Sequence, residues 1–407
     1  MKKNFDVVIV GGGMVGASLA RSLAGSGLSI AVLEAWPLES QHQPSYDDRA
    51  IALSYGTRRI LEGMGVWTAL QDKVEPIRRI HVSDRGRFGF TRLDHRDLEV
   101  DALGYVATGQ LLGQVLSKGL EDQPGIQFFC PASLSSFEVG EERVRIDADS
   151  EVGHLRITTR LLVAADGARS RVREQLGIEM REWGYGQTAV ISNLTPDQSQ
   201  DGTAYERFTD SGPMAMLPLT EGRYGLVWTL ADEVVDKVMQ LDDAAFLRRV
   251  QDRFGYRLGL FQKAGRRSSY PLKLLYAREH IRPRVAVIGN AAHALHPITG
   301  QGFNLGIRDV AVLADVVDEA HRGGGDIGSM DILRRYADWR KNDQLAAVLL
   351  TDGLVRLFTN PLLPLRMARN VGLLALDCIP PAKRLLTRQF MGLNGRLPKL
   401  SRGLSLD

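Results

Sequence analysis

The stretch FDVVIVGGGMVGASLARSLAGSGLSIAVLEA, residues 5–35, decides the fold, because it holds a complete strand, helix and strand. The apolar run of residues 5–10 is typical of a buried strand, and the apolar residues after it recur with helical spacing. Residues 29–35 return as a second strand. A unit of this kind predicts a parallel sheet with a helix packed against it.

The turn between the first strand and the helix carries the pattern Gly11-x-Gly13-x-x-Gly16, with Met14 at the start of the helix. The first glycine permits a tight turn, the second lets the backbone approach a pyrophosphate, and the third lets helix and strand pack closely. Glu34 ends the next strand, where its carboxylate can accept hydrogen bonds from both hydroxyls of a ribose. The pattern predicts a site for FAD or NAD, and a plain glycine turn is the alternative.

The composition is that of a globular protein large enough for two domains, with 407 residues of which 44% are hydrophobic and 24% charged. No stretch approaches the roughly 18 apolar residues that a membrane-spanning helix needs. Cys130 and Cys378 are the only cysteines, and neither lies in a cluster of Cys and His. We therefore expect neither a disulfide framework nor a metal site.

The net charge of +3 is unevenly distributed along the chain. Residues 351–407 hold nine Lys and Arg against three Asp, which makes this segment +6 and leaves −3 for residues 1–350. A basic segment rich in leucine favours contact with anionic lipid or with a partner protein rather than with nucleic acid. A solvated helical cap on the core is the alternative.

Two further buried strands are predicted, and each runs into a glycine: RLLVAADG at 160–167 and RVAVIGNAA at 284–292. Between them, residues 184–275 show alternating patterns that predict an antiparallel sheet, joined by the stretch 78–104. After about residue 330 the pattern is helical to the end, with interruptions at prolines.

Both later strands lead into motifs. The first has the form DGxxSxxR, with Asp166, Gly167, Ser170 and Arg173. The second begins at Gly289 and Asn290 and continues as HPxxGQGxN, with His296, Pro297, Gly300, Gly302, Phe303 and Asn304. Glycines in the second motif let the backbone run against a flat ring, and N–H groups at the start of the next helix can stabilise negative charge there.

In these three motifs and their order, the chain resembles the class A FAD-dependent aromatic hydroxylases, the family of para-hydroxybenzoate hydroxylase. The resemblance implies a Rossmann-like FAD-binding domain in three pieces (1–77, 105–183 and 276–345), interleaved with an antiparallel β-sheet substrate domain (78–104 and 184–275). Residues 346–407 are expected to form a C-terminal helical segment. The fold class is α/β.

The same resemblance implies which residues bind FAD: Gly11, Gly13, Met14, Gly16, Glu34, Arg49, Gln110, Asp166, Gly167, Gly289, Asn290, Pro297, Gly300, Gly302, Phe303 and Asn304. Asn290 stands where the family usually has an aspartate, and its amide can still bond a hydroxyl of the ribitol chain. Arg49 could instead pair with Asp47 or Asp48 on the surface, and the match at Gln110 is loose. His296 is a weak candidate for a catalytic residue, because an orienting role beside Pro297 is favoured over proton transfer.

Segments such as DDRAIALSYGTRRIL and YERFTDSGPMAMLPL are similar to the subgroup of this family that acts in ubiquinone biosynthesis. The resemblance implies a monooxygenase that uses FAD, dioxygen and NAD(P)H to hydroxylate a lipophilic prenylated phenol, 2-polyprenyl-6-methoxyphenol. NAD(P)H is expected to bind only transiently, because the sequence has a single Gly-x-Gly-x-x-Gly motif that lies between a predicted strand and a predicted helix. We expect a cytoplasmic protein, with peripheral contact to the inner membrane or to a complex of ubiquinone-biosynthesis enzymes through residues 351–395.

Three other functions stay open at this point. A related hydroxylase could act at another ring position or on a soluble aromatic acid. A flavin-dependent prenyl reductase would share the DG-type scaffold. A flavoprotein that only senses redox state is the alternative without catalysis, since fold alone does not prove activity.

Overall fold

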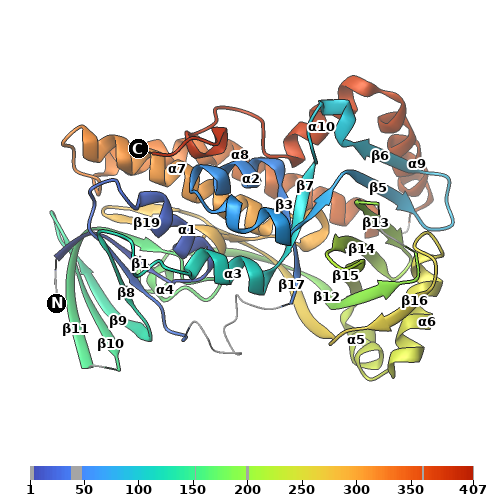
Figure 1. Cartoon of the computed structure of the whole chain (residues 1–407), viewed down its shortest axis with the longest axis horizontal. Coiled ribbons are helices and arrows are strands. Elements are labelled where there is room, and N and C mark those ends of the chain that lie inside the picture. Colours follow the sequence, from blue (N-terminus) through green and yellow to red (C-terminus); the bar gives the residue numbers. More distant parts are fainter. Residues whose placement is uncertain (1–3, 38–47, 152, 199–200, 360–361, 407) are drawn as a thin grey trace.

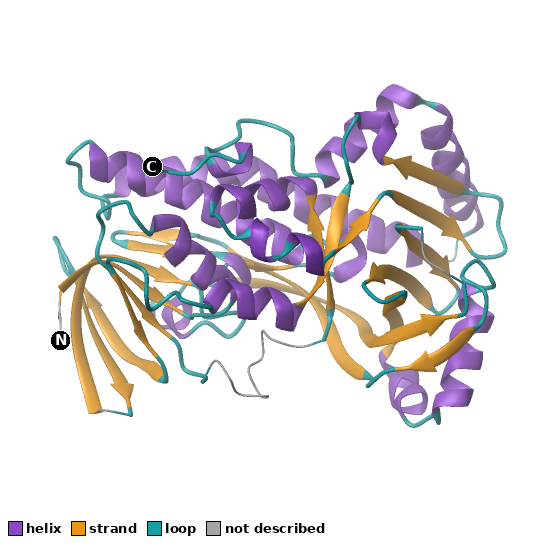
Figure 2. Cartoon of the chain, viewed as in Figure 1, coloured by secondary structure: helices purple, strands orange, loops and turns teal. Residues whose placement is uncertain are grey.

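The computed structural model describes residues 4–37, 48–151, 153–198, 201–359 and 362–406. Two large sheets lie at opposite ends of an elongated molecule, and a layer of helices runs along one side of them (Figures 1 and 2). The fold is mixed α/β with parallel and antiparallel pairing, as the sequence predicted.

The first sheet has a parallel centre in the order β18-β19-β11-β1-β2-β8. Strand β1 is paired in parallel with both β2 and β11, and its residues Val7, Val8 and Ile9 are fully buried because helices or strands cover both faces. The strands of this sheet are β1 (Asn4–Val10), β2 (Ile30–Leu33), β8 (Ile126–Phe129), β9 (Ala132–Val139), β10 (Val144–Ser150), β11 (Gly153–Ala164), β18 (Ile281–Arg282) and β19 (Val285–Val287).

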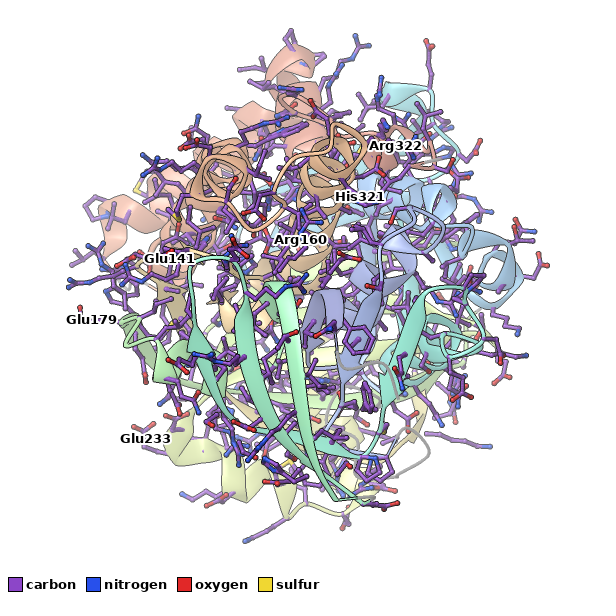
Figure 3. All side chains as sticks on the ribbon, turned by 90° about the vertical axis from the view of Figure 1, so that its left-hand side faces the viewer. Glu141, Arg160, Glu179, Glu233, His321 and Arg322 are labelled. Atoms are coloured by element: carbon purple, nitrogen blue, oxygen red, sulfur yellow. The ribbon has the colours of Figure 1, made fainter. Side chains whose placement is uncertain are left out.

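Strands β9 and β10 extend this sheet as an antiparallel meander with β11. Figure 3 looks onto this end of the molecule and shows the three strands side by side, with Arg160 of β11 near the helices. Arg160 and Arg284 both contact Asp326 there, which ties the strand ends to the loop before α8.

The second sheet follows the order β20-β17-β12-β15-β14-β13-β5-β6. Apart from the parallel pair β13 and β5, neighbouring strands on this path are antiparallel. Its strands are β5 (Arg79–Asp84), β6 (Phe90–Asp94), β12 (Met180–Pro196), β13 (Thr203–Thr209), β14 (Gly212–Leu219), β15 (Arg223–Ala231), β16 (Phe261–Ala264), β17 (Ser268–Ala277) and β20 (His293–Ala294). A small third sheet holds β3 (Ala50–Ser54), β7 (Gly104–Thr108) and β4 (Glu75–Ile77).

Helices cover both large sheets and bury separate apolar cores. Helices α1 and α7 pack on the first sheet, and α5 and α6 pack on the second. The α-helices are α1 (Met14–Leu23), α2 (Tyr55–Gly63), α3 (Gly109–Ser117), α4 (Arg171–Gln175), α5 (Asp232–Met239), α6 (Asp243–Phe254), α7 (Gly302–Arg322), α8 (Met330–Thr359), α9 (Leu363–Cys378) and α10 (Pro380–Phe390). The short 3-10 helices are η1 (Trp67–Ala69), η2 (Gln71–Lys73), η3 (His95–Leu98), η4 (Gly289–Ala291), η5 (Pro297–Thr299) and η6 (Leu400–Arg402).

The C-terminal segment takes part in both halves of the molecule. Helices α9 and α10 lie over β5 and β6 at the upper right of Figure 1, and the chain then returns over α2. Leu400 and Leu406 are buried in the same core as Val7 and Ile9. Within the described part of the chain, none of the helices has both the length and the apolar character to cross a bilayer.

The boundaries expected at 183/184 and 275/276 fall inside β12 and β17, two long strands that pair with each other. The boundary expected at 345/346 falls inside α8. The three-part division of the chain therefore stays a prediction, and these continuous elements run across its borders.

Candidate functional site

Three loops meet at one cavity of about 610 Å³. The start of α1 contributes Gly13 and Met14, the turn after β11 contributes Gly167, and the loop after β19 contributes Asn290. The parallel strands β1, β11 and β19 bring these loops together, because their carboxyl ends lie at the same edge of the sheet.

Ten of the residues predicted to bind FAD line this cavity: Gly13, Met14, Arg49, Gly167, Asn290, Pro297, Gly300, Gly302, Phe303 and Asn304. Six others and the weak catalytic candidate do not: Gly11, Gly16, Glu34, Gln110, Asp166, Gly289 and His296. Gln110 is exposed on α3, so nothing in its position supports a contact with the cavity.

The first glycine turn is packed too closely for side chains. Gly11 has φ of +100°, in the region that favours glycine, and a Cβ on Gly16 would overlap the carbonyl oxygen of Gly11. Glu34 lies beside this turn, where Oε2 accepts a hydrogen bond of 2.7 Å from the N–H of Gly12. Burial raises the pKa of Glu34, although the N–H groups of Trp36 and Gly12 act to lower it.

The second motif is tied to the third by an arginine. Nη1 of Arg173 donates to the carbonyl of Ala291 at 2.9 Å, and Nη2 donates to the carbonyl of Ala168 at 2.9 Å. Asp166 accepts a weak bond of 3.3 Å from the N–H of Val172 through Oδ2. Its other oxygen, Oδ1, is buried and has no hydrogen-bond partner among the described residues, and burial raises the pKa of this carboxyl.

Asn304 fixes the start of α7 against β3. Its Nδ2 donates to the carbonyls of Ala52 and Gly300, at 2.8 and 2.7 Å. Its Oδ1 accepts from the N–H of Ser54 and from the hydroxyl of Thr57, at 2.8 and 2.7 Å. The hydrogen-bonding capacity of this amide is therefore used within the protein, which makes Asn304 a residue that shapes the cavity wall.

A buried charged cluster, which the sequence reasoning missed, supports the loop after β19. The carboxylate of Asp309 contacts Nε2 of His293 at 2.7 Å, Nε of Arg340 at 2.8 Å and Nε2 of Gln344 at 2.9 Å. Burial alone would raise the pKa of Asp309, but His293 and Arg340 hold it well below its usual range. The signal available in the sequence was a polar residue inside the apolar pattern of GIRDVAVLADVV.

Of the two candidates Arg49 and His296, Arg49 lines the cavity and His296 does not. The guanidinium of Arg49 lies 4.8 Å from the ring centre of Tyr270, a cation–π contact at the cavity surface. Asp48 is described, whereas Asp47 lies outside the described residues. His296 is buried with its Nδ1 accepting from the N–H of Ile298, and burial lowers its pKa to about 4. A neutral, turn-forming His296 fits the orienting role better than proton transfer.

The cavity continues from the glycine loops between the face of the second sheet and the C-terminal helices. At this far end its lining is almost entirely apolar and comes from α8, α9 and α10: Leu350, Leu354, Phe358, Leu373, Leu376, Leu386, Thr387 and Phe390. Phe358 stacks on Phe208 of β13 with 3.4 Å between ring centres. One end of the cavity is therefore lined by loop backbone and the other by hydrocarbon.

Comparisons with known proteins agree with this geometry. A family model described as "FAD binding domain" matches residues 4–348. The chain is 37% identical to the ubiquinone hydroxylase UbiL of Rhodospirillum rubrum, over 98% of this chain and 93% of that protein. It is 32% identical to the 3-demethoxyubiquinol 3-hydroxylase of Escherichia coli, over 95% of this chain and 98% of that protein.

A solved structure shares the fold. The p-nitrophenol 4-monooxygenase PnpA of Pseudomonas putida superposes with a TM-score of 0.80 at 21% identity, covering 97% of this chain and 100% of that one. The match of the family model over most of the chain, together with relatives above 30% identity over nearly their whole length, settles the family. The chain belongs to the family of FAD-dependent hydroxylases that carry this FAD binding domain.

Proposed function

We propose that this protein hydroxylates the aromatic ring of a polyprenylated phenol on the route to ubiquinone, with FAD as resident cofactor and NAD(P)H as transient reductant. One observation carries the proposal: a single cavity joins the glycine loops to an apolar compartment under α8, α9 and α10. A ring placed at the junction would have the flavin on one side and room for a hydrocarbon chain on the other. The names of the relatives support ubiquinone precursors as the substrate class.

The residues at the loop end of the cavity fit FAD. The start of α1 at Gly13 and Met14 offers free N–H groups to the pyrophosphate, and Glu34 lies where it can bind the adenosine ribose. The unpartnered Oδ1 of Asp166 leaves a buried acceptor that a flavin hydroxyl or N–H could satisfy. When bound, FAD supplies the reduced flavin that activates dioxygen.

The chain's own contribution is to hold the phenol and keep water out. The face of the second sheet offers Ala189, Ile191, Ala215, Leu217 and Val227 to the ring, and none of these can hydrogen-bond through its side chain. Among the described residues of the lining, Arg49 is the one cation, and it stands beside Tyr270 at the loop end. A soluble aromatic acid would need a cation at the ring, so the lining favours a neutral, lipophilic substrate.

The test begins with the purified protein and its flavin spectrum. NAD(P)H oxidation and oxygen uptake are then measured with 2-prenylphenol, 2-prenyl-6-methoxyphenol and a short-chain 3-demethoxyubiquinol, and products are identified by mass spectrometry. We expect one of the three to stimulate oxidation and gain one oxygen atom, which also identifies the ring position. A colourless protein after reconstitution with FAD, or a product reduced in its prenyl chain, would contradict the proposal.

We also propose that helices α9 and α10 rest on an anionic lipid surface. Large apolar side chains are exposed along them, among them Leu365, Met367, Val371, Ile379 and Leu385. Arg384 and Arg388 are exposed on α10 beside them. Exposed apolar residues flanked by arginines fit the interface of a bilayer, and these helices also line the apolar end of the cavity.

Vesicle sedimentation tests this surface. Wild-type protein should sediment with vesicles of phosphatidylglycerol and phosphatidylethanolamine, and less with neutral phosphatidylcholine vesicles. The double variant Leu385→Glu with Arg388→Glu should lose most of this binding, whereas Leu260→Glu, at an exposed leucine between α6 and β16, should keep it. Equal sedimentation of both variants, or binding only to another enzyme of the pathway, would contradict a lipid contact.

A further inference from the structure

Glu206 is the one carboxyl group among the described residues that line the cavity. It lies on β13, directly opposite Val82 of β5 and Ala215 of β14. Ala215 is in turn opposite Val227 of β15. Every residue of this row lines the cavity, so the side chain of Glu206 lies in an otherwise apolar stripe across the sheet.

This carboxyl has no compensating neighbour. In the part of the chain that the structure describes, no hydrogen bond or ion pair is formed by the side chain of Glu206, and its cross-strand neighbours are a valine and an alanine. Burial raises the pKa of Glu206 to about 8, and no neighbouring charge contributes to the shift. Helices α8 and α9 contribute hydrocarbon side chains to the cavity, among them Phe358 and Leu376.

Glu206 is half-buried in the cavity wall, and a carboxyl in such apolar surroundings without a partner destabilises the folded protein, because its loss of hydration is not offset by any hydrogen bond. Native proteins satisfy nearly all buried polar groups, and exceptions are concentrated at sites that bind a ligand. Thr91 of β6 is a second exception on the same wall, since its buried Oγ1 also has no partner among the described residues. Both observations indicate that an oxygen-bearing ligand belongs here.

We propose that Glu206 is a catalytic residue that contacts the ring hydroxyl of the bound phenol and takes its proton. This inference rests on the proposed function, because it assumes a phenol in the cavity. In the step, the phenol O–H bond breaks, the proton goes to a carboxylate oxygen of Glu206, and the electron pair stays on the phenol oxygen. The resulting phenolate is richer in electrons at its ortho and para carbons, which are the positions an electrophilic oxygen attacks.

The environment of Glu206 suits this proton transfer. A general base works best when its pKa lies near the working pH, and an ordinary exposed glutamate is far too weak a base for a phenol. The apolar surroundings raise the pKa of Glu206 into this range, and no second charged group takes part in the shift. The fraction of Glu206 in the basic form increases as the pH rises through about 8, so hydroxylation should increase over the same range.

The experiment compares wild-type holoenzyme with Glu206→Gln, which keeps size and polarity but cannot accept a proton. The probe is 2-prenylphenol, added without NAD(P)H so that no turnover occurs, and the hydrogen bonding of its hydroxyl is read from the near-ultraviolet difference spectrum. In wild type the phenol band should shift to longer wavelength with a midpoint near pH 8, because ionised Glu206 then accepts a hydrogen bond from the phenol O–H, and Glu206→Gln should show no shift with pH. In steady state, kcat of Glu206→Gln should fall about 10²- to 10⁴-fold, with a smaller change in KM.

Two further variants separate catalysis from structure. Glu182→Gln, at an exposed carboxylate of the same sheet that pairs with Lys273, should match wild type in all measurements. Glu206→Asp should keep the pH-dependent rise at a lower rate. Flavin content and far-ultraviolet circular dichroism report whether Glu206→Gln is folded, and if it is not, the absence of the pH-dependent rise in Glu206→Asp overturns the inference.

A folded Glu206→Gln that still shows the pH-dependent shift of the phenol band and keeps the kcat and pH profile of wild type also overturns the inference. Failure of the proposed function looks different: wild type then hydroxylates none of the phenols offered. The binding spectra with 2-prenylphenol still decide in that case, because loss of the pH-dependent shift in Glu206→Gln supports the contact and retention contradicts it.

Discussion

The carboxylate of Asp309, in the middle of α7, accepts a hydrogen bond from the backbone N–H of Gly289, 3.1 Å away. Gly289 opens the loop after β19, which carries Asn290 to the cavity. Because Asp309 also pairs with Arg340 of α8 and with His293, one buried anion holds two helices and this loop together. The position of the loop therefore depends on a charge that the cavity does not contact.

Replacing Asp309 with Ala should cost about 3–5 kcal/mol of unfolding free energy, because it removes one of the two carboxylates that pair with the buried guanidinium of Arg340 and leaves Asp343 as the other. Urea unfolding of the flavin-free protein measures this. Asp331→Ala removes an exposed carboxylate that pairs with Arg334, and should change stability by less than about 0.5 kcal/mol. Equal stability of the two variants would mean that the buried cluster is not structural.

Gly16→Ala should yield a folded protein that loses most of its flavin, because the added methyl group pushes against the carbonyl of Gly11 and shifts the turn. We expect FAD affinity to fall roughly tenfold or more, at least about 1.4 kcal/mol. The ratio of flavin to protein absorbance measures the loss. Gly353→Ala, on α8, where a Cβ would meet nothing within 4 Å, serves as the control and should keep full flavin content.

Acid should destabilise the protein through His296. Burial lowers the folded-state pKa of His296 from 6.5 to about 4, so below pH 6.5 the unfolded chain binds a proton that the folded protein does not. Stability is then lost at about 1.4 kcal/mol for each pH unit as the pH falls through that range. Urea unfolding between pH 7.5 and 4.5 should show a shallower slope for His296→Phe, with no change of slope above pH 7.

Leu376→Trp should separate long substrates from short ones. The larger indole would fill part of the apolar end of the cavity. A prenyl chain that must lie there should lose about 1–3 kcal/mol of binding free energy. KM for a phenol with a long prenyl chain should rise, while that for 2-prenylphenol should stay close to wild type. Leu349→Trp, at an exposed leucine of α8, is the matched control. A parallel rise of both KM values would show that the prenyl chain of the substrate does not lie against Leu376.

Much of the fold was predictable because local pattern and tertiary role agree in the buried strands. The run at residues 5–10 became β1 (Asn4–Val10), and the alternating block became the antiparallel second sheet. Glu206 was not predictable, because alternation in YERFT places Tyr205 and Glu206 on opposite faces without saying which face the later helices cover. Asp309 was missed for a related reason, since its partners Arg340 and Gln344 come from another helix.

The burial of Leu400 and Leu406 beside Val7 and Ile9 also bears on how the molecule is made. Strand β1 cannot complete its packing until residues about 400 positions later in the chain have been translated. Until then, helix α2 and its neighbours expose the apolar surface that η6 later covers. The core of the nascent protein therefore stays incompletely packed during synthesis, and chaperones can bind its exposed apolar surface in that state.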